Sequence, residues 1–173
     1  MKVSEDTIRR DLGELSDQGL IIKIHGGALS TSFHTSLQQT AVYSQEKKRI
    51  VAQKALCFIQ PGMFVLSTGG TTIIELARIL PPDLKATFIT GSLPAAMEYI
   101  QHPQIDLIFI GDKISRTSLI SVGGEAISKI SEIKADICLL GINAIDTKHG
   151  ITDNDWEVVQ VKKKMIESSK KVI

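Results

Sequence analysis

The chain has 173 residues, which allows one full domain with a small appendage and excludes a two-domain enzyme of ordinary size. Its 20 Lys and Arg against 19 Asp and Glu leave a formal net charge of +1, so contacts with nucleic acid must be local rather than driven by overall charge. Hydrophobic residues make up 43% of the chain, which is typical of a folded protein with a buried core. No apolar stretch approaches the ~20 residues of a membrane span.

The first segment predicts a helix followed by a strand. Ser4 suits the N-cap of a helix over residues 5–18, with Gly19 as its stop. The apolar residues of this helix form one narrow stripe, which must pack on something: Ile8, Leu12 and Leu15. Residues 20–25 form a β-branched run closed by two glycines, which predicts a strand and a turn. We interpret residues 1–29 as one small unit and the polar residues 30–43 as a linker.

From residue 44 onwards, alternating patterns predict an α/β domain. A helix is expected at about 44–59, and four short apolar runs predict strands that are buried on both faces. These runs are 63–66, 86–90, 105–110 and 136–140. Glycine loops and helices follow the strands, as in the βα units of a parallel sheet. A last helix is expected at 155–169, and Val172–Ile173 has the character of a strand that is just beginning.

The two cysteines indicate the compartment. Cys57 and Cys138 lie far apart in apolar runs, a pattern typical of reduced, buried thiols rather than of a disulfide framework. The first residues lack a hydrophobic signal core. We therefore expect two buried thiols and a cytoplasmic protein.

Glycine and hydroxyl groups collect where the predicted strands end. The carboxyl ends of parallel strands meet at one edge of a sheet, and ligands of such sheets bind there. The loop over 67–72 leads into a helix N-terminus, which suits a phosphate group, although the same residues also serve a tight turn and a helix cap. The residues alone leave both interpretations open. The candidate ligand-binding residues at this edge are Thr68, Gly70, Thr71, Thr72, Thr90, Ser92 and Gly111.

The last predicted helix carries a second set of candidates. Helical spacing gives it an inward stripe of Val158, Met165 and Ile166. Lys162 and Asp155 fall within the same arc, so Lys162 either extends to the rim or neutralises a bound phosphate. Asp155 or Glu157 would then accept hydroxyl groups of the ligand. The four histidines show no metal-ligand spacing and no cofactor motif is present, so neither a metal nor a cofactor is expected.

Two groups of residues together point to a known family. The segment Ser4–Leu12, with His25–Ala28, resembles the recognition helix and wing of the DeoR family of bacterial transcription regulators. The rest of the chain resembles the sugar-phosphate sensor domain of that family. The matching residues are Gly70-Thr71-Thr72, Thr90–Pro94, Gly111, Val122-Gly123, Asp136–Gly141, Gly150–Thr152 and Asp155 through Lys162 to Met165.

The resemblance implies a fold, a function and partners. The fold would be a parallel-sheet sensor domain similar to ribose-5-phosphate isomerase, preceded by a truncated winged helix-turn-helix. The function would be a repressor of sugar metabolism genes, not an enzyme, with operator DNA and a phosphorylated sugar as partners and a homo-oligomeric assembly. The implied DNA-binding residues are Ser4, Thr7, Arg9, Arg10, His25 and Gly26. Without the resemblance, Arg10 is as well explained by an ion pair with Glu14 or Asp6 on a solvated helix.

The chain differs from the family pattern at three positions near the expected ligand. Thr68 stands where the family has Asp, Gly91 where it has Asn, and Asp112 where it has Gly. The DNA-binding domain of the family also begins well before the position of Ser4, and the chain ends early, so we expect a fragment or a truncated chain. Two other functions stay open at this point. One is a sugar-phosphate isomerase that uses Asp155, Glu157 and Lys162, and the other is a dimerising sensor module without DNA contact.

Overall fold

The computed structural model describes residues 4–18, 20–30 and 45–173. The chain divides into two compact units, with the division between Tyr43 and Ser44, and each unit is described here by itself. The predicted linker lies outside the described residues except for its first residue, Ser30, and Gly19 lies outside them as well. No helix within these ranges is long and apolar enough to cross a membrane.

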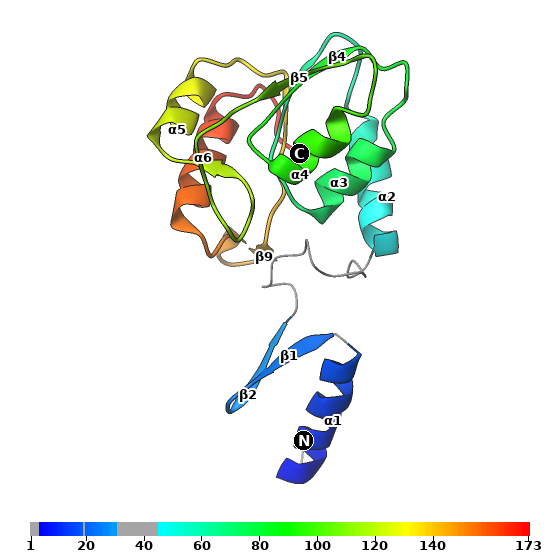
Figure 1. Cartoon of the computed structure of the whole chain (residues 1–173), viewed down its shortest axis with the longest axis vertical. Coiled ribbons are helices and arrows are strands. Elements are labelled where there is room, and N and C mark those ends of the chain that lie inside the picture. Colours follow the sequence, from blue (N-terminus) through cyan, green and yellow to red (C-terminus); the bar gives the residue numbers. More distant parts are fainter. Residues whose placement is uncertain (1–3, 19, 31–44) are drawn as a thin grey trace. The chain divides into compact units, whose positions relative to one another are not determined.

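The first unit is a helix followed by a two-stranded hairpin (Figure 1). Helix α1 (Glu5–Asp17) begins at Ser4, whose Oγ accepts the amide of Thr7 at 3.2 Å, which confirms the predicted N-cap. Strands β1 (Ile21–Ile24) and β2 (Gly27–Ser30) pair antiparallel, and Gly26 makes the turn with a φ of 82°. Strand β2 was not predicted, because its sequence Gly-Ala-Leu-Ser contains no β-branched residue.

The second unit is built on a four-stranded parallel sheet in the order β5-β4-β3-β8. Its strands are β3 (Phe64–Ser67), β4 (Ala86–Thr90), β5 (Ile105–Phe109) and β8 (Ile137–Leu139). Val172 bridges Cys138 in parallel, and the amide of Leu140 donates to the carbonyl of Ile173 at 2.8 Å. The predicted strand at Val172–Ile173 therefore begins beside β8, as the parallel α/β prediction requires.

Helices cover the two faces of this sheet separately (Figure 1). One group comprises α2 (Gln45–Leu56), α3 (Thr71–Arg78) and α4 (Leu93–Tyr99), and the other α5 (Gly124–Ser131) and α6 (Trp156–Glu167). Successive strand residues point to opposite faces, so Val65 and Phe88 join the α2–α4 core, whereas Leu66 and Ile89 join the α5–α6 core. The α/β architecture predicted from the sequence is confirmed.

Several short elements escaped prediction. They are helix α5 and two antiparallel hairpins, β6 (Lys113–Ile114) with β7 (Ser121–Val122), and β9 (Ala144–Asp146) with β10 (Gly150–Thr152). The strands are only two or three residues long, too short to show an alternating pattern. Helix α5 begins directly after Gly123, which has a φ of 115°. The Gly-Gly pair at this start is typical of a turn, so the sequence gives no signal that a helix begins there.

Three burial predictions were wrong. Strand β5 is not buried on both faces: it is the edge strand, and Ile108 on its α5–α6 side is 47% exposed. Cys57 is exposed, because it follows the last residue of α2 in a turn. In α6, Ile166 is 42% exposed, and Val161 takes the inward position beside Val158 and Met165.

The different environments of the two thiols are testable with a thiol-reactive reagent. We expect Cys57 to react in the folded protein and Cys138 to react only after unfolding, because burial raises the pKa of the Cys138 thiol to about 12 and closes access to it. Counting reacted thiols with and without denaturant should give one and then two. A Cys57→Ser variant that still reacts when folded would contradict the core position of Cys138.

Candidate functional site at the carboxyl edge of the sheet

The loops that follow β3 and β8 approach each other at the carboxyl edge of the sheet. The amide of Gly141 donates to Thr68 Oγ1 at 2.6 Å. A Cβ on Gly141 would collide with the carbonyl oxygen of Gly69, and one on Gly69 would lie 2.6 Å from Ser92 Oγ. Both glycines are therefore required by the close approach of the loops.

Three of the predicted ligand-binding hydroxyls are buried and already hydrogen-bonded at this edge: Thr68, Thr90 and Ser92. Thr90 Oγ1 donates to the carbonyl of Ser67 at 2.8 Å and accepts the amide of Ser92 at 3.1 Å. Ser92 Oγ accepts the amide of Ala95 at the start of α4, at 3.4 Å. In this structure these side chains join the loops to one another, and their role toward a ligand stays a prediction.

The start of α3 differs from the starts of the other helices at this edge. Gly70 precedes α3 with a φ of 110°, and Thr71 and Thr72, both partly exposed, form its first turn. Within the described residues no side chain accepts the first amides of α3. Helices α4 and α6 begin with the caps Ser92 and Asp155. The open amides of α3 can therefore accept an anion from outside the chain.

Asp112, which replaces a glycine of the family pattern, occupies the start of α5. Its carboxylate accepts the amide of Ala126 at 3.0 Å and that of Lys113 at 2.6 Å, and these bonds lower the pKa of Asp112. A Cβ on Gly123 would lie 2.6 Å from this carboxylate, so the glycine leaves room for it. Gly111, the neighbouring candidate ligand-binding residue, accepts a hydrogen bond from Lys129 Nζ at its backbone carbonyl, at 3.4 Å. The amide of Ala126 in the first turn of α5 is thus satisfied within the chain.

Asp155 joins the β6–β7 hairpin to α6. Its Oδ1 accepts the amides of Glu157 and Val158 at 3.1 and 3.3 Å, and its Oδ2 accepts the hydroxyl of Ser115 at 2.7 Å. Burial acts to raise the pKa of Asp155, but the hydrogen bonds from Ser115 and the α6 amides together outweigh it and lower the pKa. Asp155 is therefore ionised at neutral pH and caps the helix.

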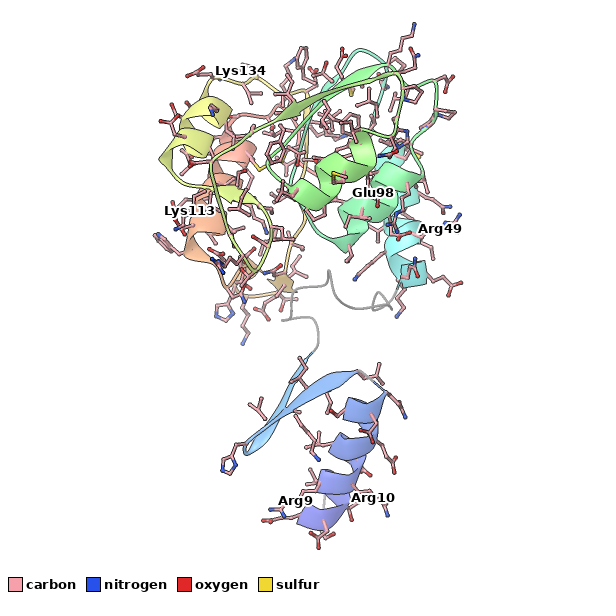
Figure 2. The ribbon with its side chains drawn as sticks, viewed as in Figure 1. Arg9, Arg10, Arg49, Glu98, Lys113 and Lys134 are labelled. Atoms are coloured by element: carbon pink, nitrogen blue, oxygen red, sulfur yellow. The ribbon has the colours of Figure 1, made fainter. Side chains whose placement is uncertain are left out.

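Lys162 does point inward, as predicted, but its charge has a partner that the sequence interpretation missed. Lys162 Nζ lies 2.5 Å from Asp153 Oδ2, and the two side chains are only 12% and 6% exposed. Asn143 Nδ2 donates to the other Asp153 oxygen at 2.9 Å. Glu157 instead lies at the surface and pairs with Lys113 at 2.8 Å (Figure 2). The only sequence signal for Asp153 is its place in the polar run that precedes α6.

One more buried polar group was missed. Ser121 in β7 is 1% exposed, and its Oγ has no hydrogen-bond partner among the described residues. The amide of Ser121 donates to the carbonyl of Gly91 at 2.8 Å, and a Cβ on Gly91 would lie 3.2 Å from the Ser121 Cβ. Position 91, where the family pattern has Asn, therefore has little room for a side chain, and a serine hydroxyl lies next to it.

The predicted DNA-binding residues lie on the first unit. Arg9 and Arg10 project from α1 and are exposed (Figure 2). Arg10 Nε lies 4.0 Å from Glu14 Oε1 with both side chains mostly exposed, so the predicted ion pair forms but is weak. Ser4 and Thr7 share a hydrogen bond of 2.8 Å at the helix start, whereas His25 and Gly26 are exposed at the hairpin turn.

The described residues contain no group of three or more His, Cys, Asp or Glu side chains that is arranged to hold a metal ion. The groups that the sheet edge presents are hydroxyls, backbone amides, the carboxylates of Asp112 and Asp155, and the Lys162–Asp153 pair.

Solved structures share the fold of the second unit. Ribose 5 phosphate isomerase A from Neisseria gonorrhoeae matches with a TM-score of 0.52 and 15% identity, over 74% of this chain and 49% of that one. A D-ribose-5-phosphate isomerase in complex with phospho-erythronic acid also has a TM-score of 0.52, with 17% identity over 76% of this chain and 51% of that one. The second unit therefore has the α/β fold of ribose-5-phosphate isomerase, and the predicted similarity of fold is confirmed.

The sequence comparisons give the family. Residues 43–173 match the model of the DeoR C terminal sensor domain, and residues 1–33 match the DeoR-like helix-turn-helix domain. The chain belongs to the DeoR family of transcription regulators. It is 34% identical to the HTH-type transcriptional regulator GlpR of Haloferax volcanii over 98% of this chain and 68% of that protein. The HTH-type transcriptional repressor GlcR of Bacillus subtilis is 33% identical over 100% of this chain and 67% of that protein. The chain thus spans about two thirds of the length of these relatives.

The Lys162–Asp153 pair makes a prediction for stability. Lys162→Met leaves the Asp153 carboxylate buried without its cation, which should lower the free energy of unfolding by about 3–5 kcal/mol. The double variant Asp153→Asn, Lys162→Met should recover part of the loss, because the buried charge is then gone. Urea denaturation measures both. A single Lys162→Met variant that is as stable as the native protein would contradict the buried pair.

Proposed function

We propose that the chain is a DNA-binding transcriptional repressor whose second unit binds a phosphorylated sugar. The phosphate lies at the start of α3, on the amides that follow Gly70, and the sugar extends toward the Ser121 hydroxyl and the Lys162–Asp153 pair. The observation that carries this proposal is the contrast among helix starts. In helices α4, α5 and α6, Ser92, Asp112 and Asp155 accept first-turn amides, and α3 has no such side-chain acceptor among the described residues.

The family relationship supports the regulatory part of this proposal. Relatives include proteins named as a glycerol-3-phosphate regulon repressor and as a putative aga operon transcriptional repressor. Both domain types that such a regulator needs match segments of this chain. A regulator that acts on DNA is also expected in the cytoplasm, which is the compartment inferred from the cysteines.

The alternative of a sugar-phosphate isomerase is less well supported. It requires Asp155, Glu157 and Lys162 to act together as acid, base and electrostatic group. Each of these three side chains instead has a separate partner: Ser115, Lys113 and Asp153 respectively. Incubation with ribose 5-phosphate should therefore yield no ribulose 5-phosphate above the rate of a heat-denatured control.

Effector binding is tested by a carboxylate placed at the start of α3. Thr71→Asp fills the open amides and repels phosphate, so the affinity for ribose 5-phosphate should fall at least ~10-fold, given ~1.5–3 kcal/mol for a charged hydrogen bond. Stability should hold or rise, because an acid in the first turn is favourable. Isothermal titration calorimetry with ribose 5-phosphate, glycerol 3-phosphate and inorganic phosphate measures the affinities.

Gln53→Glu is the matched control, since it adds the same charge at an exposed position of α2. It should leave the affinities unchanged. Equal affinity in Thr71→Asp and in the native protein would place the phosphate elsewhere. A native protein that binds none of the three ligands would overturn the sensor function itself.

DNA binding is tested on α1. Arg9 and Arg10 are exposed cations on the helix that matches the helix-turn-helix model, one suited to a backbone phosphate and the other to a base edge. Replacing both with Ala should weaken binding to duplexes selected from a random pool by ~1–3 kcal/mol, with a shallower salt dependence. Fluorescence anisotropy at several salt concentrations measures both effects.

The control for this variant is Lys47→Ala with Arg49→Ala, which removes two exposed cations from α2 (Figure 2). It should leave DNA affinity nearly unchanged. An equal loss in both double variants would mean that overall charge, and not α1, determines the binding.

A further inference from the structure

Helix α4 carries large apolar side chains on its solvent face. Leu93, Met97 and Ile100 are 41%, 67% and 64% exposed. At 100° per residue these three positions lie within about 60° of one another around the helix. Ala95 and Tyr99 on the opposite side are fully buried in the core. The helix is therefore apolar on both its inner and its outer face.

The neighbours of α4 fix the direction of this outer face. Glu98 reaches α3, where it accepts from Arg78 at 2.7 Å (Figure 2). Because the core lies on the Tyr99 side and α3 on the Glu98 side, the stripe of Leu93, Met97 and Ile100 points outward and away from α3. Helix α4 also packs on β4 and β5. The stripe is thus on the side of the molecule where β5 ends the sheet.

Strand β5 is itself uncovered along this side. It is the terminal strand of the sheet, and Ile108 and Phe109 are 47% and 40% exposed. The amide of Ile110 donates to the carbonyl of Thr90 in β4 at 2.9 Å. By the alternation of a strand, the amides of Leu107 and Phe109 then point to the open edge. An edge of this kind is a template for pairing with another strand.

We propose that β5 and the outer face of α4 form the interface between two copies of this chain. The two β5 strands pair antiparallel about a two-fold axis through Leu107, and the two α4 stripes pack together on one side of the joined sheet. This surface is separate from the carboxyl-edge ligand site, so the proposal holds whether or not a sugar phosphate binds.

The exposed apolar area of β5 and α4 can be compared with the area that a stable dimer buries. If a fully exposed large side chain presents roughly 200 Å², the five exposed residues of β5 and α4 present about 500 Å² per copy. Two copies then cover at most about 1,000 Å² of apolar surface, which is the lower limit for a specific interface, and the polar rim and the paired strand edges add to it. A patch of this size is in the upper part of the range that monomeric proteins expose, and patches of this kind are often functional.

The strand is also compatible with pairing to itself. With Leu107 on the axis, Asp106 of one copy lies opposite Ile108 of the other, so the carboxylates of the two copies do not face each other. Ile105 lies opposite Phe109, and this pair brings an apolar side chain against an aromatic one. A two-fold axis makes both copies contribute the same surface, as most homodimers do.

The first test changes the α4 stripe. Met97→Glu with Ile100→Glu places four like charges in the dimer interface, and both positions are exposed enough for the fold to tolerate the change. We expect the native chain to sediment as a dimer at micromolar concentration and the variant as a monomer, with an association constant at least ~100-fold lower. Circular dichroism shows whether the variant is folded.

The matched control is Ile50→Glu with Val51→Glu, which makes the same change at two exposed apolar positions of α2. This control should remain a dimer. A native chain that is monomeric, or a dimer that the α2 change dissociates and the α4 change does not, would overturn the proposal.

The second test traps the strand register. Residues 106 and 108 of opposite copies form a non-hydrogen-bonded pair with Cα atoms about 4.5 Å apart, within the range of a disulfide. In a Cys57→Ser background, Asp106→Cys with Ile108→Cys should give a covalent dimer on mild oxidation. Asp106→Cys alone should give no covalent dimer, because position 106 of one chain and position 106 of the other lie diagonally across the axis, about 8 Å apart. Equal cross-linking of the single and the double variant, or none in either, would exclude the register centred on Leu107.

Discussion

The close approach of the loops at the carboxyl edge of the sheet is the constraint on which the second unit depends. Gly141 donates to Thr68, Thr90 donates to Ser67, and the hydroxyl of Tyr99 in α4 donates to Ser67 Oγ at 3.1 Å. The side chains of Ser67, Thr68, Thr90 and Tyr99 are almost completely buried, so each missing partner would cost the desolvation energy of a polar group. The hydrogen bonds therefore fix the ends of β3, β4 and β8 relative to one another and to the last turn of α4.

The same constraint determines which part of the edge is open to a ligand. Hydroxyls that join the loops are occupied, and carboxylates such as Asp112 and Asp155 satisfy the helix starts near them. Among the described residues, the start of α3 stays open, as does the Ser121 hydroxyl, and Gly70 before α3 adopts a φ of 110° and provides no side chain. The positive end of the α3 dipole and its unpaired amides then act in the same direction, and both favour an anion.

Much of this arrangement could be predicted from the sequence, because strands, glycine loops and helix caps have local signals. The N-cap Ser4 is an example, as is the order of the βα units. What could not be predicted depends on partners far apart in the chain. Lys162 has the spacing of an inward residue, but its neutralisation by Asp153 depends on how the loop before α6 folds back. The occupation of the α5 start by Asp112 likewise requires that residues 112 and 126 meet.

Burial errors have a similar origin, since hydrophobicity reports what a residue can bury and not what covers it. The run at 105–110 has the composition of a central strand, yet β5 ends the sheet, and Ile108 on its α5–α6 side stays 47% exposed. Ile50 and Val51 in α2 are exposed for the same reason, because only one side of that helix meets the core. An edge strand with the sequence of an interior strand leaves apolar side chains and backbone groups uncovered. A strand from a second sheet that pairs with this edge covers both. Pairing of two β5 strands, as proposed above, gives this strand the neighbour that the described residues do not supply.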